Sequence, residues 1–200
     1  MIKGCKICGI SDPDTLNYII NHQFHPLFVG FIVNYKKSSR FVEYKKLKKL
    51  VNIDKKGINF VAVLVNPDEA VLEKIQYLNF DYYQLYNVNA QQTKSIKEKY
   101  NKKIITTITI NQKSDVEKFR EYTSSADIIL FDSAGYEKSL SFNKSYLKDL
   151  PKNINFMIAG NFKPYDNFKL LDKKFNFIID ISGGVESEKG IKDKEKINQF

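Results

Sequence analysis

A thiol and a carboxylate each end an apolar run in this chain of 200 residues. Cys8 follows Lys6-Ile7 and is itself followed by Gly9, and Asp132 ends the run 128–131. If both side chains reach one cavity, they form a plausible acid–base pair, and a thiol whose pKa is lowered can act as a base or nucleophile. Each residue also has a purely structural interpretation, because a free cysteine is often a small core residue and an aspartate after a strand often caps a helix.

Residues suited to binding an anion follow other apolar runs. The planar guanidinium of Arg40 could hold a carboxylate or a phosphate. Gln84 lies at the end of a short run and is a further candidate for contacting a substrate. Glycine turns follow the last two runs, with Gly160 and Asn161 in the first and Ser182, Gly183 and Gly184 in the second. Backbone N–H groups in such turns approach a phosphate closely, although glycine also simply ends strands and caps helices.

One spacing near the N-terminus is similar to that of zinc sites. Cys5, Cys8, His22 and His25 form the pattern C-x2-C-x13-H-x2-H. The histidine gap is shorter than the usual gap of about three to five residues, and a predicted helix separates the cysteines from the histidines. We therefore expect no metal at these residues.

Eight short apolar runs alternate with longer amphipathic stretches. The runs are typical of buried strands, because they are nearly continuously apolar or rich in β-branched residues. Strands are expected at residues 3–9, 27–33, 60–65, 82–85, 104–110, 128–132, 156–159 and 177–181. Helices are expected at residues 12–22, 41–51, 66–78, 91–100, 111–122, 144–150 and 164–171, and from about residue 193.

This alternation favours a parallel sheet, and eight units favour its closure into a (β/α)8 TIM barrel. Residues 1–200 would then form a single α/β domain, at the short end of the range for this fold. An open, doubly wound sheet is the alternative. In a barrel the loops after the strands form one face and carry the active site, so the strand-end residues named above are the candidates.

The composition favours a cytoplasmic globular protein. No apolar run is long enough to span a membrane, and charged residues interrupt the first apolar stretch, unlike in a signal peptide. Two cysteines do not build a disulfide-rich secreted fold. The net charge of +9 is nearly all lysine, much of it on predicted helices such as 44–50 and 94–103. We expect these lysines to form solvated helix faces, with no nucleic-acid or membrane partner.

Short blocks along the whole chain carry a further pattern. They are Lys6-Ile7-Cys8-Gly9, Gly30-Phe31 with Ser38-Ser39-Arg40-Phe41, Val65-Asn66-Pro67, Tyr83-Gln84-Leu85, Leu130-Phe131-Asp132-Ser133, Ile158-Ala159-Gly160, Asp180-Ile181-Ser182-Gly183-Gly184-Val185-Glu186-Ser187 and Lys189-Gly190-Ile191-Lys192-Asp193. In this order, from residue 3 to about residue 198, the chain resembles the phosphoribosylanthranilate isomerase family.

The resemblance implies an Amadori rearrangement in tryptophan biosynthesis, from N-(5-phosphoribosyl)anthranilate to 1-(2-carboxyphenylamino)-1-deoxyribulose 5-phosphate. It implies that Asp132 is the general acid, that Cys8 is the general base, and that Arg40 holds the anthranilate carboxylate. No metal or organic cofactor is implied, because the imine is the electron sink. The implied partner is a phosphorylated small molecule, with the chain a monomer or homodimer. Because the base must be ionised near neutral pH, we expect a depressed pKa for Cys8, helped by Lys6.

The chain also departs from the family pattern. Tyr86-Asn87 stand where the family often has His-Gly, and Gly160-Asn161 stand where it has paired glycines. After the sixth expected strand, residues 136–139 and 142–144 replace a Gly-Gly-Thr-Gly and a Phe-Asp-Trp. These departures leave two alternatives open: a related sugar-phosphate barrel enzyme with another substrate, and a non-catalytic binding barrel.

Overall fold

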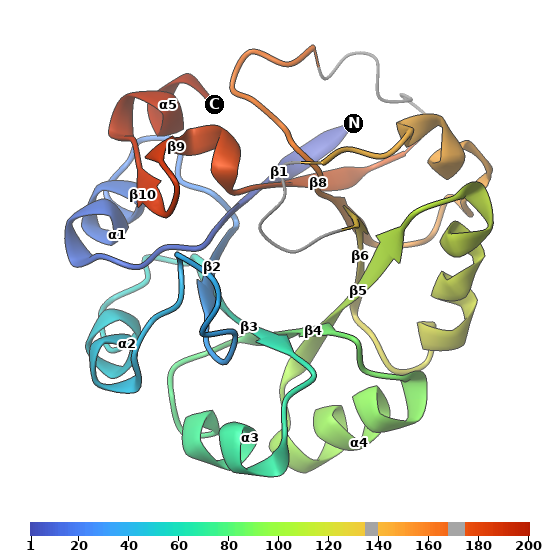
Figure 1. Ribbon diagram of the computed structural model, residues 1–200, viewed down its shortest axis with the longest axis horizontal. Coiled ribbons are helices and arrows are strands. Elements are labelled where there is room, and N and C mark those ends of the chain that lie inside the picture. Colours follow the sequence, from blue (N-terminus) through green and yellow to red (C-terminus); the bar gives the residue numbers. More distant parts are fainter. Residues whose placement is uncertain (135–139, 168–174) are drawn as a thin grey trace.

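The computed structural model describes residues 1–134, 140–167 and 175–200, and in these ranges eight parallel strands close into a barrel (Figure 1). The strands are β1 Ile2–Cys8, β2 Phe28–Ile32, β3 Asn59–Val65, β4 Tyr82–Tyr86, β5 Lys103–Ile110, β6 Ile128–Ser133, β7 Phe156–Ile158 and β8 Phe177–Ile181. Strands adjacent in the chain are adjacent in the sheet, and β1 pairs with β8 to complete the ring. The expected (β/α)8 barrel is confirmed, and the open-sheet alternative is wrong.

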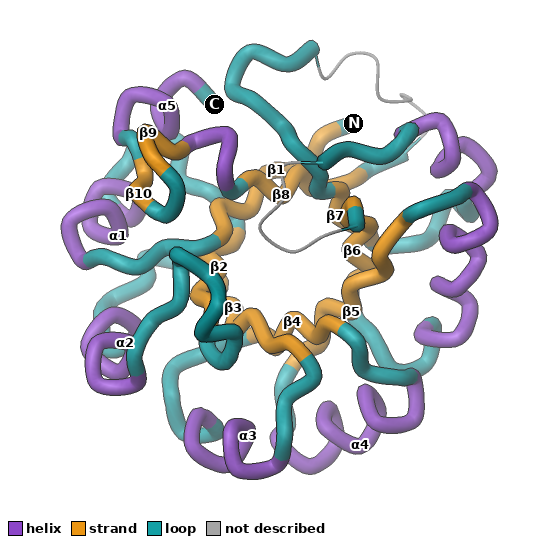
Figure 2. The backbone as a smooth tube through the Cα atoms, viewed as in Figure 1, coloured by secondary structure: helices purple, strands orange, loops and turns teal. Residues whose placement is uncertain are grey.

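The helices surround the ring of strands (Figure 2). The α-helices are α1 Pro13–Ile20, α2 Tyr44–Val51, α3 Glu69–Ile75, α4 Ala90–Tyr100 and α5 Lys194–Gln199. The 3-10 helices are η1 Lys113–Tyr122, η2 Lys144–Asp149 and η4 Gly183–Val185. A two-stranded sheet of β9 Glu186–Glu188 and β10 Ile191–Lys192 lies in the chain between η4 and α5.

Several helices differ from their expected form, and the one expected at 41–51 begins at Tyr44. The helix expected from residue 66 begins at Glu69, because the Asp68 carboxylate accepts a hydrogen bond from the N–H of Val71 and so caps it. The helices expected at 111–122 and 144–150 are 3-10 helices. Two segments, 135–139 and 168–174, lie outside the described residues. The first contains the family departure at 136–139, and the second contains part of the helix expected at 164–171.

The strands are apolar on both faces because one face packs against the helices and the other packs inside the barrel. Side chains alternate along a strand, so Tyr83 and Leu85 of β4 lie in the core beneath the helices, whereas Tyr82 packs inside the barrel. Val63 and Leu130 share that interior cluster. The inward-facing residue nearest the carboxyl end of each strand therefore reaches the mouth of the barrel.

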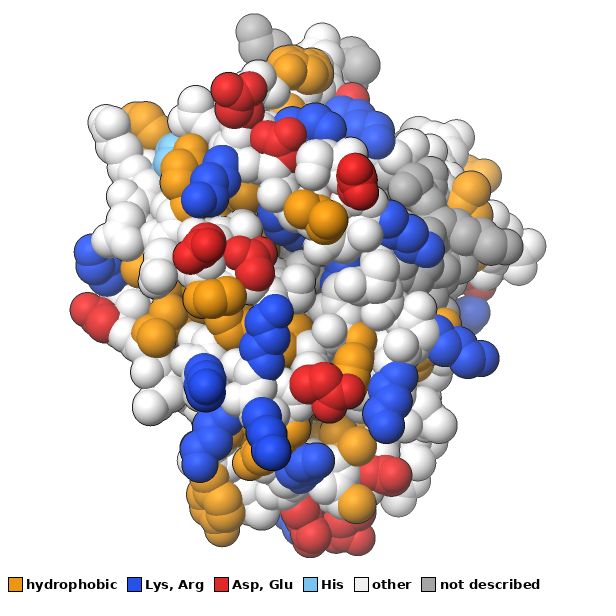
Figure 3. Space-filling view, turned by 60° about the vertical axis from the view of Figure 1, so that its left-hand side comes forward, with side chains coloured by type: hydrophobic (Ala, Val, Ile, Leu, Met, Phe, Trp, Pro, Cys, Tyr) orange, Lys and Arg blue, Asp and Glu red, His pale blue; other side chains and the backbone are white. Residues whose placement is uncertain are grey.

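Many lysines lie on helices, and those of α2 show the expected solvated face. In α2 the buried residues are Leu47, Leu50 and Val51, and the four lysines of the helix are exposed. Figure 3 shows Lys and Arg side chains interspersed with Asp and Glu on one face of the molecule. No helix in the described ranges combines the length and apolar character needed to cross a membrane.

Candidate active site

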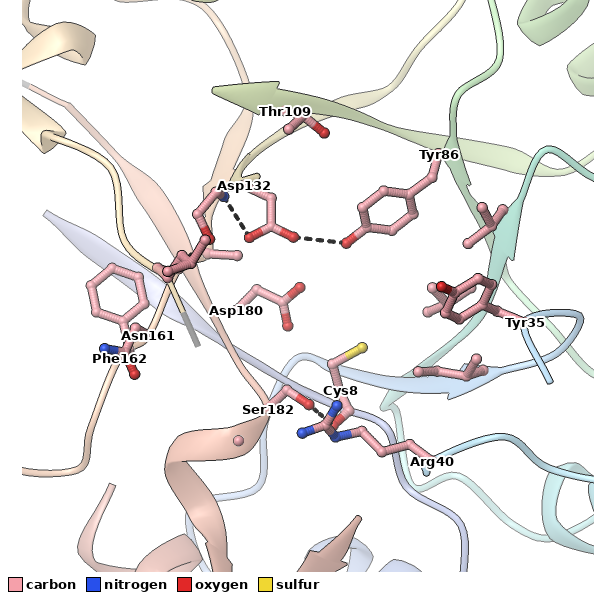
Figure 4. Close-up of a pocket in the computed structure, with 18 of the residues that line it drawn as sticks. Cys8, Tyr35, Arg40, Tyr86, Thr109, Asp132, Asn161, Phe162, Asp180 and Ser182 are labelled. Carbon is pink, nitrogen blue, oxygen red and sulfur yellow. Dashed lines mark hydrogen bonds between the residues drawn. The ribbon is translucent and has the colours of Figure 1, made fainter. Parts of the chain in front are cut away.

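A cavity of about 360 Å³ opens at the carboxyl ends of the strands (Figure 4). Strand ends and the loops that follow them line it, and this is the face where barrel enzymes build their active sites. Figure 4 shows side chains from β1, β4, β6 and β8 directed into the same space. The expected site residues that line the cavity are Cys8, Arg40, Asp132, Gly160, Asn161, Ser182, Gly183 and Gly184.

Gln84 is the expected site residue that does not line this cavity. It is fully buried, and neither polar atom of its side chain has a hydrogen-bond partner. β4 continues to Tyr86, one residue beyond its expected end, so the two-residue repeat of the strand places Tyr86 at the mouth. Gln84 therefore lies below the cavity and not on its lining, where a substrate contact would require it.

Cys8 ends β1 beside a buried ion pair. Lys6 lies two residues earlier on the same strand face, and its Nζ is 2.8 Å from Oδ2 of Asp180 on β8. Gly30 on β2 leaves room for both side chains, because a Cβ at this position would lie 2.9 Å from Cys8 Sγ and 3.2 Å from Lys6 Nζ. The thiol, the ammonium and the carboxylate therefore meet at one place just inside the mouth.

The Cys8 thiol is harder to ionise than the sequence suggests. Burial raises its pKa, Lys6 lowers it, Asp180 raises it again, and the pKa stays above its ordinary value. The expected depressed pKa is wrong, because removing a thiolate from water costs more than one neighbouring ammonium returns. Lys6 itself is charged: burial lowers its pKa, but Asp180 more than reverses that effect.

Asp132, the penultimate residue of β6, is held by two hydrogen bonds. The Tyr86 hydroxyl donates to its Oδ2 at 3.0 Å, and the Ser133 N–H donates to its Oδ1 at 2.8 Å. Burial raises the pKa of Asp132, the Asp180 charge raises it further, and the two hydrogen bonds oppose that rise, with a result of about 6. Asp132 can therefore hold or release a proton close to neutral pH, which a general acid requires.

These two pKa directions set the protonation of the pair. Near pH 7, Cys8 is mainly a thiol and Asp132 is mainly a carboxylate. The form with a Cys8 thiolate and a protonated Asp132 holds the same number of protons, with the proton on Asp132 in place of Cys8. Transfer of one proton from Cys8 to Asp132 therefore converts the dominant form of the pair into the other form.

Arg40 is fixed at the edge of the cavity by a bidentate ion pair. Its Nε and Nη2 lie 2.6 and 2.8 Å from the two carboxylate oxygens of Glu186, and Lys192 Nζ lies 2.6 Å from the same carboxylate. Burial raises the pKa of Glu186, but Arg40 and Lys192 outweigh this and hold it at about 2. Two cations around one carboxylate leave a net positive charge where an anionic group of a ligand could bind.

The two glycine turns meet at the mouth of the barrel, and Ser182 of the second turn lies beside Cys8 and Arg40 (Figure 4). A Cβ on Gly184 would lie 1.9 Å from the Phe162 carbonyl oxygen, so the loops after β7 and β8 approach more closely than any side chain permits. Gly160 has φ +107°, a conformation that favours glycine. The two turns therefore line the cavity with glycine backbone beside the side chains of Asn161 and Ser182.

Gly184→Ala is expected to push these loops apart. The added methyl group overlaps the Phe162 carbonyl, which we expect to destabilise the fold by about 1–3 kcal/mol. We also expect KM for a phosphorylated substrate to rise more than kcat falls. Steady-state kinetics and urea unfolding measure the two effects. Gly57→Ala is the control for KM only: its methyl group meets no atom within 4 Å, but its φ of +87° makes alanine strained, so its stability should also fall. An equal rise in KM there would contradict the prediction.

The zinc-like spacing does not form a site among the described residues. Cys5 and Cys8 are three residues apart on β1, so their side chains point to opposite faces of the strand. His22 Nε2 instead lies 3.0 Å from Oδ1 of Asn198. Within the described ranges, no group of three or more His, Cys, Asp or Glu side chains is arranged to hold a metal ion.

Three further residues of the site were not among the expected ones. Asp180 is a charged residue inside the apolar run 177–181. Because a charged residue is rarely buried without a partner, its position in the sequence already indicates a buried ion pair or a functional role. Tyr86 stands at one of the departures from the family pattern. Glu186 belongs to the block after β8, but its pairing with Arg40 joins positions 146 residues apart and leaves no local signal.

The fold and this cavity define a class: a (β/α)8 barrel with a thiol, a carboxyl group and two glycine turns at one mouth. Residues 5–200 match the family model described as N-(5'-phosphoribosyl)anthranilate (PRA) isomerase. The chain belongs to the N-(5'-phosphoribosyl)anthranilate isomerase family, whose members are isomerases of tryptophan biosynthesis.

Relatives with this name match along nearly their whole length. The protein from Rhizobium rhizogenes (strain K84) is 31% identical over 210 residues, which cover all of this chain and 93% of the relative. The protein from Agrobacterium fabrum (strain C58) is 29% identical and is covered to 94%.

Solved structures agree with the fold. Phosphoribosyl anthranilate isomerase from Thermotoga maritima superposes with a TM-score of 0.86 at 24% identity, over 100% of this chain and 97% of that one. A structure of phosphoribosyl anthranilate isomerase in complex with reduced 1-(o-carboxyphenylamino)-1-deoxyribulose 5-phosphate has a TM-score of 0.84 at 24% identity, over 100% and 96% of the two chains.

Proposed function

We propose that this chain catalyses the Amadori rearrangement of N-(5-phosphoribosyl)anthranilate, with Asp132 as general acid and Cys8 as general base. The observation that carries the proposal is that both side chains line one cavity in a barrel of this family. Arg40 contacts the anthranilate carboxylate, and the glycine turns after β7 and β8 bind the phosphate. In this proposal the ribose lies between the two proton-transfer groups.

The reaction moves protons in two steps. Asp132 gives its proton to the ribose ring oxygen while the bond from C1 to that oxygen breaks, and the nitrogen lone pair forms a protonated imine. The Cys8 thiolate then takes the proton from C2, and the electron pair of that bond neutralises the imine to give an enolamine, which tautomerises to the ketone. Because the two residues end in exchanged protonation states, one proton must return from Cys8 to Asp132 before the next turnover.

Turnover of freshly generated N-(5-phosphoribosyl)anthranilate tests the proposal. The expected result is a loss of anthranilate fluorescence that depends on enzyme concentration, with the carboxyphenylamino deoxyribulose phosphate identified by mass spectrometry. A folded protein that leaves this substrate unchanged would refute the proposal. That outcome would favour the barrel enzyme with another substrate or the non-catalytic barrel.

The pH profile of kcat/KM is expected to be bell-shaped. Activity requires the Cys8–Asp132 pair to hold one proton, so kcat/KM should rise with pH through the Asp132 pKa of about 6. It should fall again only in alkaline solution, because the pKa of Cys8 lies above its ordinary value. Initial rates from pH 5 to 10 measure both limbs. A profile that increases steadily as the pH drops below 6 would contradict the assignment.

The proposed activity also implies a ligand, an oligomeric state and a cellular compartment for this chain. The ligand is a phosphorylated small molecule, the chain acts as a monomer or homodimer, and the enzyme works in the cytoplasm. Two findings support this proposal: many lysines lie on the outer faces of helices, and no helix in the described part of the chain could span a membrane. A relative from Thermotoga maritima is described as dimeric.

A further inference from the structure

Tyr86 ties the proposed general acid to another strand of the barrel. Tyr86 is the last residue of β4, Asp132 lies near the end of β6, and β5 lies between them. The Tyr86 hydroxyl is 3.0 Å from Oδ2 of Asp132 and points to it across the mouth (Figure 4). The other hydrogen bond, to Oδ1, comes from the adjacent Ser133 N–H. Tyr86 therefore restrains the carboxyl group from outside its own segment.

We propose that Tyr86 is a positioning residue for the general acid, and that its hydroxyl also stabilises the Asp132 carboxylate formed when the proton leaves. The inference rests on the proposed function. During the transfer, the proton moves from Asp132 to the ring oxygen, and Tyr86 keeps its own proton. A donor aimed at a charge that develops in the transition state lowers the barrier, because it needs no reorganisation when the reaction occurs.

Tyr86 remains a neutral donor throughout the working pH range. Burial raises its pKa, and the negative charge of Asp132 raises it further, so the phenol stays protonated. The other ionisable groups close to Tyr86 or Asp132 come from three elements. They are Lys6 and Cys8 on β1, Asp180 on β8 and Lys144 on η2. Carboxylates and the thiol face the phenol, so a tyrosinate there would be strongly disfavoured.

Tyr86→Phe tests the proposal because it removes the hydroxyl and keeps the ring. The hydroxyl of Tyr86 stabilises the carboxylate form of Asp132. Its removal should therefore raise the pKa of Asp132 above about 6. The acidic limb of kcat/KM should then move to higher pH. We expect kcat to fall about 10- to 100-fold, the effect of one hydrogen bond to a charged group, with little change in KM.

The Asp132 pKa can be read without substrate by carbon-13 NMR of protein labelled at aspartate carboxyl groups. Asp132→Asn identifies the signal, and Tyr82→Phe, two residues earlier on β4, is the matched control that should leave the pKa unchanged. An Asp132 titration in Tyr86→Phe equal to that of the wild type would overturn the inference. A raised pKa with unchanged kcat would overturn it too.

The two readouts also separate this inference from the proposed function. If the wild type does not turn over the substrate, the reaction assignment and the role of Tyr86 in it both fall. The NMR titration then still reports whether the Tyr86–Asp132 hydrogen bond exists. If the wild type is active and Tyr86→Phe changes neither readout, the proposed function stands and only the role of Tyr86 is refuted.

Discussion

Cys8→Ala is expected to lower kcat/KM about 10²- to 10⁴-fold, the range for loss of a positioned acid or base. Alanine retains the Cβ of Cys8 inside the barrel but cannot accept the proton from C2. Cys8 is in the interior cluster that includes Val63 and Leu130, and alanine fits that apolar setting, so the variant should stay folded. Fluorescence-based steady-state kinetics measure the loss, and circular dichroism checks the fold.

Cys5→Ala is the matched control for Cys8→Ala. Cys5 lies on the same strand but on the opposite face, and burial together with the Asp180 charge raises its pKa to about 12. We expect near wild-type kcat/KM for this variant. An equal loss in both cysteine variants would contradict the role of Cys8.

The double variant Cys8→Ala/Asp132→Asn tests whether the two residues act together. Removing either member stops the same proton cycle, so the double variant should be little worse than the worse single variant. Losses that multiply would indicate that the two residues contribute independently. Undiminished activity in both single variants would leave the family membership intact and refute both assigned roles.

Lys6→Met is expected to destabilise the protein by about 3–5 kcal/mol, the cost of breaking a buried ion pair. The side chain of Lys6 is fully buried and that of Asp180 is 6% exposed, so the substitution leaves a carboxylate without its counterion in the barrel. The midpoint of urea unfolding should fall accordingly. A midpoint equal to that of the wild type would contradict the importance of this pair.

Two further variants separate stability from chemistry. Lys6→Met/Asp180→Leu replaces the ion pair by apolar groups and should recover most of the lost stability. It should not recover activity, because the Cys8 thiolate loses its neighbouring ammonium and the alkaline limb of kcat/KM should move to higher pH. Lys113→Met removes an exposed ion pair with Asp149 and should change stability by no more than about 1 kcal/mol.

The order of strands and helices could be predicted from local sequence alone. Buried parallel strands are covered on both faces, so they are nearly continuous apolar runs separated by amphipathic segments. The regular alternation of the two also predicts that strand-end residues share one face of a barrel. Cys8, Asp132 and the glycine turns could therefore be assigned to one cavity before any coordinates were known.

The residues that tune the cavity depended on the tertiary structure. Lys6 and Asp180 pair across the closure of the barrel although 174 positions separate them, and Tyr86 takes the place expected for Gln84 because β4 continues one residue further. The pKa of Cys8 rises because burial outweighs the nearby lysine, and no sequence pattern reports the depth of burial. Local sequence determines which segments become strands, whereas charge, desolvation and hydrogen bonding depend on which distant side chains the closed barrel brings together.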